Sequence, residues 1–440
     1  MSYSGYITKL KNVRKHPNAD NLNIAECFGN QVIVGINSYE GEPVVYFPSD
    51  GQLGIEYCIV NNLIVKKDEF GKNIGGYLDP KKRNIRALKL RGEISDGLAL
   101  NIKSLESFTD ISSLKSGDCV DVFNGIVIAQ KYIPITTTRT TDREYSKKSK
   151  KTTFRGTSYP LFKEHIDTSQ YAYNKHVFRA GDIITITLKM HGTSHRTAKT
   201  KKIESIKPTK LNLFLAKLRL KKYKTESIEV VSGTRRTVIE SFNTGGGYYG
   251  DNAFRKPYHD DFAKKLKTNE TVYFEIVGFL EGGKTIMSTQ DNKKTNDKEF
   301  IKKYGDKTVF SYGCNPSEGR LNDAYVYRMT FTNDDGEVFE YPTWLIQKRC
   351  EEMGVKFVPV LDQFIFTTLE DLEERVDRLS DGEDPIGKTH IREGVVIRVE
   401  NSHTFKAYKN KNFHFKCIES LIKDSGVLDM EEVESLPKGE

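Results

Sequence analysis

The stretch "ITLKMHGTSHRT", Ile186 to Thr197, contains an abrupt break in pattern. The residues up to Lys189, "DIITITLK", are β-branched and apolar at alternating positions, and they predict a strand. The "MHGTS" that follows ends this pattern, and Gly192 would let the backbone approach a ligand closely. A lysine at such a strand end is either an ordinary exposed residue or a residue with a chemical role.

Lys189 could act as a nucleophile only as a neutral amine. A lysine amine is normally protonated, with a pKa of about 10.4. Burial or a neighbouring cation lowers that pKa and frees the lone pair, and Arg196 is a candidate for that cation. The local sequence therefore permits a catalytic lysine without requiring one.

The chain around this stretch predicts an α+β fold with antiparallel sheets and flanking helices. Residues 1–134 contain short β-type runs such as "NQVIVGI" and "PVVYF", separated by turn residues, which is typical of a small barrel or sandwich. Residues 135–158 are basic and almost free of apolar side chains, so we expect a linker. Residues 159–440 alternate strands with helical segments such as "TWLIQKRCEEMGV" and form a second expected domain.

Composition limits the class of protein. The 440 residues are 37% hydrophobic and 29% charged, with a net charge of +8, which permits a polyanionic partner. No apolar run is long enough for a membrane helix, and we expect no membrane association. Six scattered cysteines without a C-x-x-C pair argue against a zinc site and favour a reducing, cytoplasmic location.

The segment "LKMHGTS" resembles the first signature of the covalent nucleotidyltransferases, which include ATP-dependent DNA and RNA ligases and mRNA capping enzymes. The His-Gly pair followed by Thr-Ser is similar to RNA ligases, whereas DNA ligases usually carry Asp there. The resemblance implies an ATP-grasp-like ligase domain in which Lys189 forms a lysyl-AMP adduct. It also implies that His191, Gly192 and Arg196 bind the nucleotide.

Three further segments resemble later signatures of this superfamily in the expected order. "VSGTRRTVIES" resembles an arginine strand, in which we assign Arg236 to the nucleotide and Arg235 to RNA, although the two remain interchangeable. "VYFEIVGF" implies that Glu275 contacts the ribose. "AYVYRMTF" implies that Tyr327 stacks on adenine, with Tyr325 as the alternative on the same strand face.

The last two signatures lie near the C-terminal end of the resemblance. "REGVVIRVE" implies that Glu393 binds a divalent metal ion or orients a phosphate. "FKAYKNKNFHFK" implies a phosphate-binding pair, which we align to Lys409 and Lys411, catalytic residues that share one strand face. Two other lysines give competing alignments, Lys406 and Lys416.

The N-terminal residues resemble a different family. "VRKHPNADNLNIAECFGNQVIVG", Val13 to Gly35, is similar to the OB-fold tRNA-binding module of several synthetases. "FPSDGQL" and "KLRGEISDGLAL" resemble segments of RNA ligases that carry such a module ahead of the ligase domain. The resemblance implies an RNA-binding β-barrel over residues 1–134.

Together these resemblances imply an ATP-dependent RNA ligase, with Mg²⁺ or Mn²⁺ as its metal ion, that joins RNA 3′-OH and 5′-phosphate ends. A nicked duplex in RNA repair is the expected substrate. We expect the groups from Lys189 to Lys411 to suffice for adenylylation, and residues 1–134 to serve the sealing step. The alternatives are a non-catalytic RNA-binding protein with a degenerate ligase domain and a DNA ligase or capping enzyme. The latter two usually carry an OB domain after the last lysine signature, where residues 412–440 leave too little chain.

Overall fold

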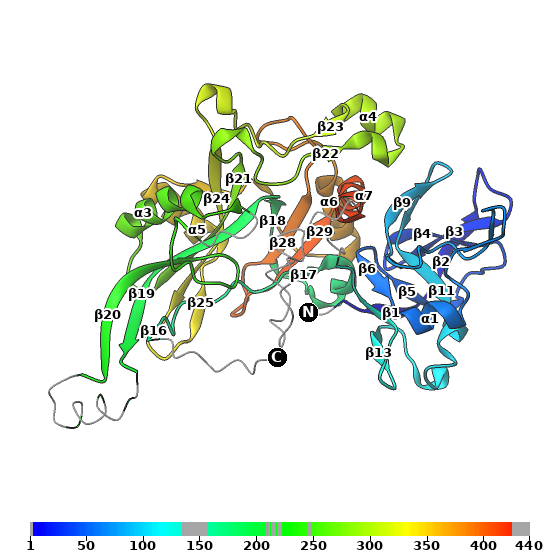
Figure 1. The fold of residues 1–440 in the computed structure, drawn as a ribbon, viewed down its shortest axis with the longest axis horizontal. Helices are drawn as coiled ribbons and strands as arrows, with labels where there is room; N and C mark the ends of the chain where they lie inside the picture. The colour runs from blue at the N-terminus through cyan, green and yellow to red at the C-terminus, as the bar shows by residue number, and fades with distance from the viewer. Residues whose placement is uncertain are drawn as a thin grey trace.

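The computed structural model describes residues 3–133, 156–207, 222–244 and 249–424, together with residues 209, 212 and 217. Most of the expected linker, residues 135–158, lies outside these described residues. Figure 1 shows the N-terminal region, drawn in blue and cyan, beside the larger region drawn in green to red. None of the described helices is long and apolar enough to cross a membrane.

The N-terminal region is rich in short antiparallel strands, as its sequence predicts. Its largest sheet has the order β11-β5-β1-β12, a second has the order β2-β3-β4, and the remaining strands pair in twos. Among the described residues these sheets do not join into one closed barrel, so the expected OB barrel is not confirmed. The elements are β1 Gly5–Lys9, β2 Lys11–Lys15, β3 Leu22–Cys27, β4 Asn30–Gly35, β5 Pro43–Phe47, β6 Gly51–Leu53, α1 Ile55–Val60, β7 Lys66–Lys67, β8 Asn73–Gly75, β9 Ala87–Leu90, β10 Glu93–Asp96, β11 Leu98–Asn101, β12 Cys119–Val120, β13 Val122–Phe123, β14 Ile126–Val127 and β15 Ala129–Lys131.

Strand β5 explains why this region folds around a double core. Val44 and Tyr46 point into one apolar cluster, while Val45 and Phe47 point into another. Alternate side chains of a strand face opposite sides of its sheet, so a strand that is apolar at every position must be covered on both sides. The run "PVVYF" therefore forms the centre of the N-terminal region.

The larger region contains two large sheets and the two-stranded pair β22-β23. The first has the order β16-β19-β21-β24-β25, with β20 paired to β19 and β26 paired to β24; the second has the order β17-β29-β28-β18-β27. Most pairs are antiparallel, as expected for an α+β fold. The strands are β16 Thr157–Ser158, β17 Ser169–Gln170, β18 Ile183–Lys189, β19 Thr193–Ser205, β20 Lys224–Gly233, β21 Glu270–Gly278, β22 Gln290–Asp291, β23 Lys307–Thr308, β24 Asn322–Thr332, β25 Val338–Glu340, β26 Lys356–Phe357, β27 Val360–Ile365, β28 Gly394–Val399 and β29 Ala407–Lys411.

Helices cover one face of each sheet and leave the other face for a site. Phe262 of α3 and Ile346 of α5 pack on the first sheet, in the cluster that contains Phe274 of β21. Leu372 of α6 packs on the second sheet, in the cluster that contains Ile186 of β18. The uncovered faces meet where β18 leads into β19. The helices are α3 Lys256–Lys265, α4 Lys298–Tyr304, α5 Thr343–Met353, α6 Leu369–Ser380 and α7 Phe413–Asp424.

Candidate active site

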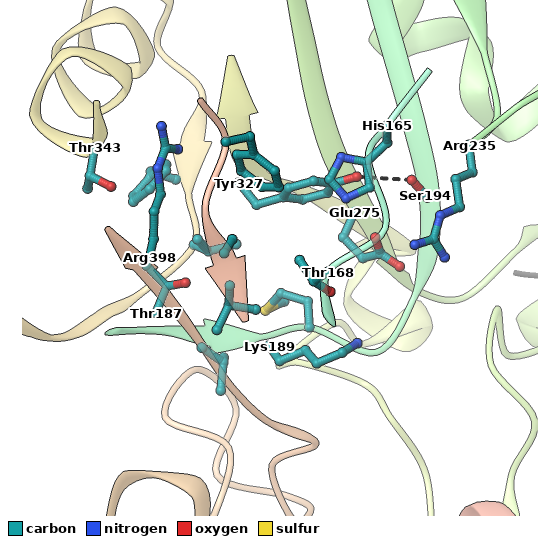
Figure 2. A pocket seen from close by; sticks show the side chains of 17 residues that line it. His165, Thr168, Thr187, Lys189, Ser194, Arg235, Glu275, Tyr327, Thr343 and Arg398 are labelled. Carbon is teal, nitrogen blue, oxygen red and sulfur yellow. Dashed lines mark hydrogen bonds between the residues drawn. The ribbon is translucent and has the colours of Figure 1, made fainter. Parts of the chain in front are cut away.

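A pocket lies between the two sheets of the larger region (Figure 2). Its empty volume is about 810 Å³ when the open solvent at its edge is included. Three polar side chains of the first sheet line it, Ser194, Glu275 and Tyr327. The second sheet contributes Thr187, Lys189 and Arg398.

Lys189 marks one end of the pocket and is paired with Glu393. Its Nζ lies 2.7 Å from Glu393 Oε1, and the Glu393 side chain is only 3% exposed. The strand register places Lys189 opposite Gly394 and Gly394 opposite Lys411. A Cβ on Gly394 would lie 2.1 Å from the Asn410 carbonyl oxygen, and its φ is +148°, so only glycine permits this close approach of β28 and β29.

The buried imidazole of His191 lies beside Glu393. Burial lowers the pKa of His191 to about 4. The His191 backbone N–H donates to the hydroxyl of Tyr312 at 2.7 Å, and its Nδ1 lies 3.9 Å from Glu393 Oε2. Glu393 Oε2 is buried and has no hydrogen-bond partner among the described residues. One oxygen of this carboxylate is therefore available to a ligand.

Lys409 and Lys411 bring further positive charge to the Lys189 end. Burial, followed by the charges of Lys411, Lys189 and Arg235, lowers the pKa of Lys409 to about 8. Lys411 is buried too, but the carboxylates of Glu419 and Glu393 outweigh that burial and raise its pKa. Lys411 Nζ lies 2.7 Å from Glu419 and 3.6 Å from Glu393. Such a concentration of cations suits an anionic ligand.

Glu275 and Gly192 form the junction of β19 with β21. Glu275 is buried and lines the pocket, as its prediction requires. Gly192 does not line the pocket; a Cβ there would lie 2.4 Å from the backbone oxygen of Ile276. The glycine thus permits close packing of the chain on β21, where we expected it to approach the nucleotide.

Arg196 is not among the residues that line the pocket, and its expected role in nucleotide binding stays a prediction. It is 2% exposed, its Nε donates to the Thr234 carbonyl at 3.0 Å, and its guanidinium lies 4.1 Å from the ring centre of Phe162. Arg196 lies on the same face of β19 as Ser194, two residues further along the strand, and it packs against Phe162. Its role in the described structure is to hold the segments around these two contacts.

The two neighbouring arginines take places opposite to those assigned from the sequence. Arg235 lines the pocket, where we expected Arg236, and its Nη2 lies 2.5 Å from Asp167. Arg236 is more exposed and reaches the same carboxylate at 3.0 Å. Asp167 therefore binds both arginines, and Arg235 is the one that lines the pocket.

Tyr327 lines the pocket, whereas Tyr325 packs in an apolar cluster beside it. The pairing of β21 with β24 shifts register between Tyr273 and Phe274 and skips Tyr327. Such a bulge re-aims a side chain. The Tyr327 ring meets His165 edge-on at 5.1 Å, and its hydroxyl lies 3.1 Å from Ser194 Oγ.

Sequence analysis missed the residues at the far end of the pocket, His165, Phe405 and Arg398. Arg398 is 8% exposed; its Nη2 donates to the Tyr341 carbonyl, but its buried Nη1 has no hydrogen-bond partner among the described residues. A cation within the apolar run "VVIRVE" was a signal of the same kind as Glu275. His165 carries no comparable signal, since it precedes the strands of the site.

Comparisons with known proteins agree on one family. A model of the RNA ligase family matches residues 182–418. The structure of a Naegleria gruberi RNA ligase with PPi is similar to this chain with a TM-score of 0.56 at 16% identity, over 93% of this chain and 97% of that one. A variant of that protein with ATP and Mn gives a TM-score of 0.54 at 16% identity, over 96% and 99%. These two likenesses show a shared fold across both regions; no curated protein matches the chain.

Proposed function

The chain belongs to the RNA ligase family, and we propose that it uses ATP to join RNA 3′-OH and 5′-phosphate ends through a lysyl-AMP intermediate. The observation that carries this proposal is the setting of Lys189. It lines the pocket together with Arg235, lies 2.7 Å from the buried carboxylate of Glu393, and has Lys409 and Lys411 nearby.

In the first step, the Lys189 amine attacks the α-phosphorus of ATP. A nitrogen–phosphorus bond forms, the amine releases a proton to solvent, the bond to the bridging oxygen breaks, and pyrophosphate leaves with that electron pair. Negative charge grows on the phosphate oxygens, and Lys409, Lys411 and Arg235 stabilise it electrostatically.

The far end of the pocket would hold the base and ribose. Tyr327 and His165 offer ring faces and edges for the base, and Glu275 accepts hydrogen bonds from ribose hydroxyls. Arg398 would donate its unsatisfied Nη1 to a ring nitrogen of adenine, because a buried donor without a partner is costly until a ligand supplies an acceptor.

In the later steps, AMP passes from Lys189 to an oxygen of the RNA 5′-phosphate, and Lys189 leaves as the free amine. The RNA 3′-OH then attacks that 5′-phosphate, loses its proton and displaces AMP. A 3′-5′ phosphodiester results. Ends aligned in a nicked duplex would suit this step best, because alignment supplies the required proximity.

The site fits a divalent metal ion such as Mg²⁺ or Mn²⁺. Glu393 offers the buried oxygen Oε2, and His191, neutral and 3.9 Å away, adds no charge that would compete. The described residues contain no cluster of three metal-ligating side chains, so nucleotide phosphates and water would complete the shell, as is usual for Mg²⁺. Such an ion would neutralise phosphate charge.

We also propose that residues 1–134 act as an OB-type RNA-binding module, joined through residues 135–158 to a ligase domain of residues 159–440. Two separate apolar clusters in the N-terminal region support a unit with its own core. Exposed lysines on β7, Lys66 and Lys67, together with the exposed ring of Phe70, would suit a nucleic-acid strand.

A direct test combines labelled nucleotides with labelled nicks. The protein should become labelled by ATP and not by GTP, and it should seal a nick in an RNA duplex with a 5′-phosphate. Labelling by GTP would indicate a capping-type enzyme, and preference for a DNA nick would indicate a DNA ligase. Binding of RNA without any label on the protein would indicate a degenerate ligase domain.

A further inference from the structure

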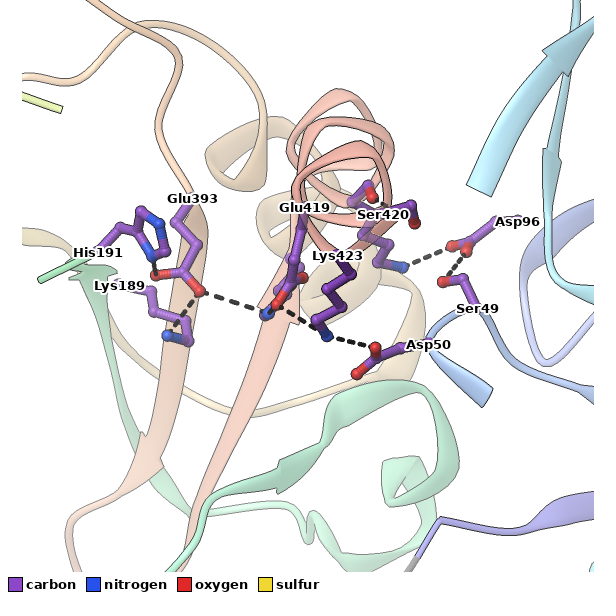
Figure 3. A network of polar contacts seen from close by, with 11 residues as sticks. Ser49, Asp50, Asp96, Lys189, His191, Glu393, Glu419, Ser420 and Lys423 are labelled. Atoms are coloured by element: carbon purple, nitrogen blue, oxygen red, sulfur yellow. Dashed lines mark hydrogen bonds and ion pairs between the residues drawn. The ribbon is translucent and has the colours of Figure 1, made fainter. Parts of the chain in front are cut away.

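A row of alternating charges leads out of the active site toward the N-terminal region (Figure 3). Lys189 Nζ lies 2.7 Å from Glu393, and Glu393 lies 3.6 Å from Lys411 Nζ. Lys411 lies 2.7 Å from Glu419 on helix α7. These contacts join the candidate nucleophile to helix α7, through a residue, Glu419, that lies outside the predicted signatures.

The row continues from α7 into the N-terminal region. Lys423 Nζ lies 3.5 Å from Glu419 and also pairs with Asp50, in the turn between β5 and β6. The Lys423 side chain is only 2% exposed, so its charge depends on nearby carboxylates. Glu419 therefore lies between two lysines, Lys411 on the active-site side and Lys423 on the N-terminal side.

Asp50 is held in place by its backbone. Its φ is +80°, a left-handed conformation that is costly for most residues but tolerated by Asp. The Asp50 N–H donates to the Ile85 carbonyl at 3.0 Å, and its carbonyl accepts from the Tyr132 N–H at 3.1 Å. The carboxylate is thus presented to α7 by a turn with a fixed conformation.

A second contact anchors the same helix independently. Lys416 lies on the same face of α7 as Glu419 and Lys423, and its Nζ is 2.5 Å from Asp96. The other oxygen of Asp96 accepts from Ser49 Oγ at 2.8 Å. This pair joins the same turn to α7 without touching Glu419 or Lys411, so it offers a matched control.

The charges from Lys189 to Lys423 are coupled because they are close together and their side chains are at most 18% exposed, while Asp50 at the end of the row is 34% exposed. Solvent screens such pairs poorly. Loss of the Asp50 charge would leave Lys423 to draw Glu419 toward itself and away from Lys411. Lys411, already 3.6 Å from Glu393, would then shift toward that carboxylate and compete with Lys189 for it.

We propose that Asp50 is a positioning residue for adenylylation: it occupies Lys423, so that Glu419 stays with Lys411 and Lys411 stays in place for the ATP phosphates. This inference rests on the proposed function. It also revises the division of labour expected from the sequence, because the N-terminal region then contributes to the first step and not only to sealing.

The test uses full-length protein and measures the rate of lysyl-AMP formation at saturating ATP. Asp50→Asn keeps the shape and the left-handed backbone but removes the charge, and it should slow the step by about tenfold. Asp96→Asn removes a charge from the same interface and should stay within about twofold of wild type. Equal rates for Asp50→Asn and wild type would overturn the inference.

The double variant D50N/K423M separates positioning from domain docking. Lys423→Met removes the competing cation, so both K423M and the double variant should form the adduct within about threefold of the wild-type rate. A double variant as slow as Asp50→Asn would overturn the inference, because the defect would then come from lost docking. If wild-type protein formed no adduct, the proposed function itself would fail, which is a distinguishable result.

Discussion

The Lys189 end of the pocket and the interface of α7 with the N-terminal region are built from the same residue types but differ in charge balance. At the pocket, Lys189 pairs with Glu393, Lys411 with Glu419 and Arg235 with Asp167, and Lys409 adds a further positive charge. The effect is measurable in Lys409, whose pKa falls to about 8 through burial and these neighbouring cations.

At the interface, each lysine has a carboxylate partner. Lys416 pairs with Asp96 and Lys423 with Asp50, and beside this interface Lys89 of β9 lies 2.5 Å from Asp297, the residue before α4. Balanced pairs of this kind join two surfaces, whereas an excess of one sign needs a ligand of the opposite sign. The comparison teaches that charge balance, more than residue type, distinguishes a phosphate site from a structural contact.

The largest effect should come from Lys189→Ala at the unbalanced end. Removal of the nucleophile should lower RNA sealing by about a thousandfold or more, because no covalent intermediate can form. Sealing of a 5′-phosphorylated nick measures this, with thermal unfolding to verify that the variant is folded. A folded Lys189→Ala protein that sealed RNA at the wild-type rate would show that Lys189 is not the nucleophile.

The sequence predicted the strands of this end because their signals are local. Strand β18 ends at Lys189 as the alternation predicts, and β29 presents Lys409 and Lys411 on the expected strand. The places of Gly192 and Arg196 were not predictable, since they depend on Ile276 and Phe162, residues brought close only by the fold. The register shift opposite Tyr327 likewise cannot be read from "AYVYRMTF".

The interface was invisible in the sequence for the same physical reason. Glu419 and Lys423 are one helical turn apart and look like an ordinary surface pair on α7. Their role in the row of charges depends on the contacts of Glu419 with Lys411 and of Lys423 with Asp50. Charge patterns reveal neighbours along a helix but not partners from distant segments.

Glu393→Gln should give the next largest effect. The amide keeps the shape but loses the charge that lies between Lys189 and Lys411, so adduct formation should fall by about a hundredfold. Glu373→Gln is a suitable control, because Glu373 forms a partly exposed pair with Lys175 away from this end of the pocket. Equal loss in both variants would show that Glu393 has no special role.

At the far end of the pocket, Arg398→Met should weaken ATP binding by about tenfold. The substitution removes a buried donor, Arg398 Nη1, which is expected to find its acceptor in the adenine base. Equilibrium binding of α,β-methylene-ATP measures this. The matched ligand is the same analogue with 7-deazaadenine, 3-deazaadenine or 1-deazaadenine as its base. The analogue that lacks the contacted ring nitrogen should bind equally to the wild-type protein and to Arg398→Met. If the wild-type protein bound all three deaza analogues more tightly than Arg398→Met by the same factor as the adenine compound, the contact would be refuted.

The charge of Lys409 should make phosphate binding depend on pH. Its folded pKa of about 8 is below the unfolded value, so it is charged below pH 8 and loses that charge as the pH rises. The protonated fraction falls from about nine tenths at pH 7 to about one tenth at pH 9. Affinity for α,β-methylene-ATP should fall several-fold over this range, and Lys409→Gln should flatten the profile. A profile unchanged by that substitution would contradict the assignment.

The smallest effect should come from the balanced interface. Lys89→Met removes one partly exposed pair with Asp297 and should lower the free energy of unfolding by about 1 kcal/mol or less. Adduct formation should remain within about twofold of wild type, in contrast to the changes at the pocket. Chemical denaturation and the labelling assay check both values, and a loss as large as that of Glu393→Gln would remove the distinction drawn here between the two regions.

The central claim is that Lys189 carries AMP during catalysis. The most direct measurement is peptide mapping by mass spectrometry after full-length protein has reacted with ATP and Mg²⁺ and been denatured under conditions that preserve a phosphoramidate. We expect one AMP group on the peptide that contains Lys189, and addition of pyrophosphate before denaturation should remove it. AMP on a different residue, or an unmodified Lys189 peptide in protein that actively seals RNA, would contradict it.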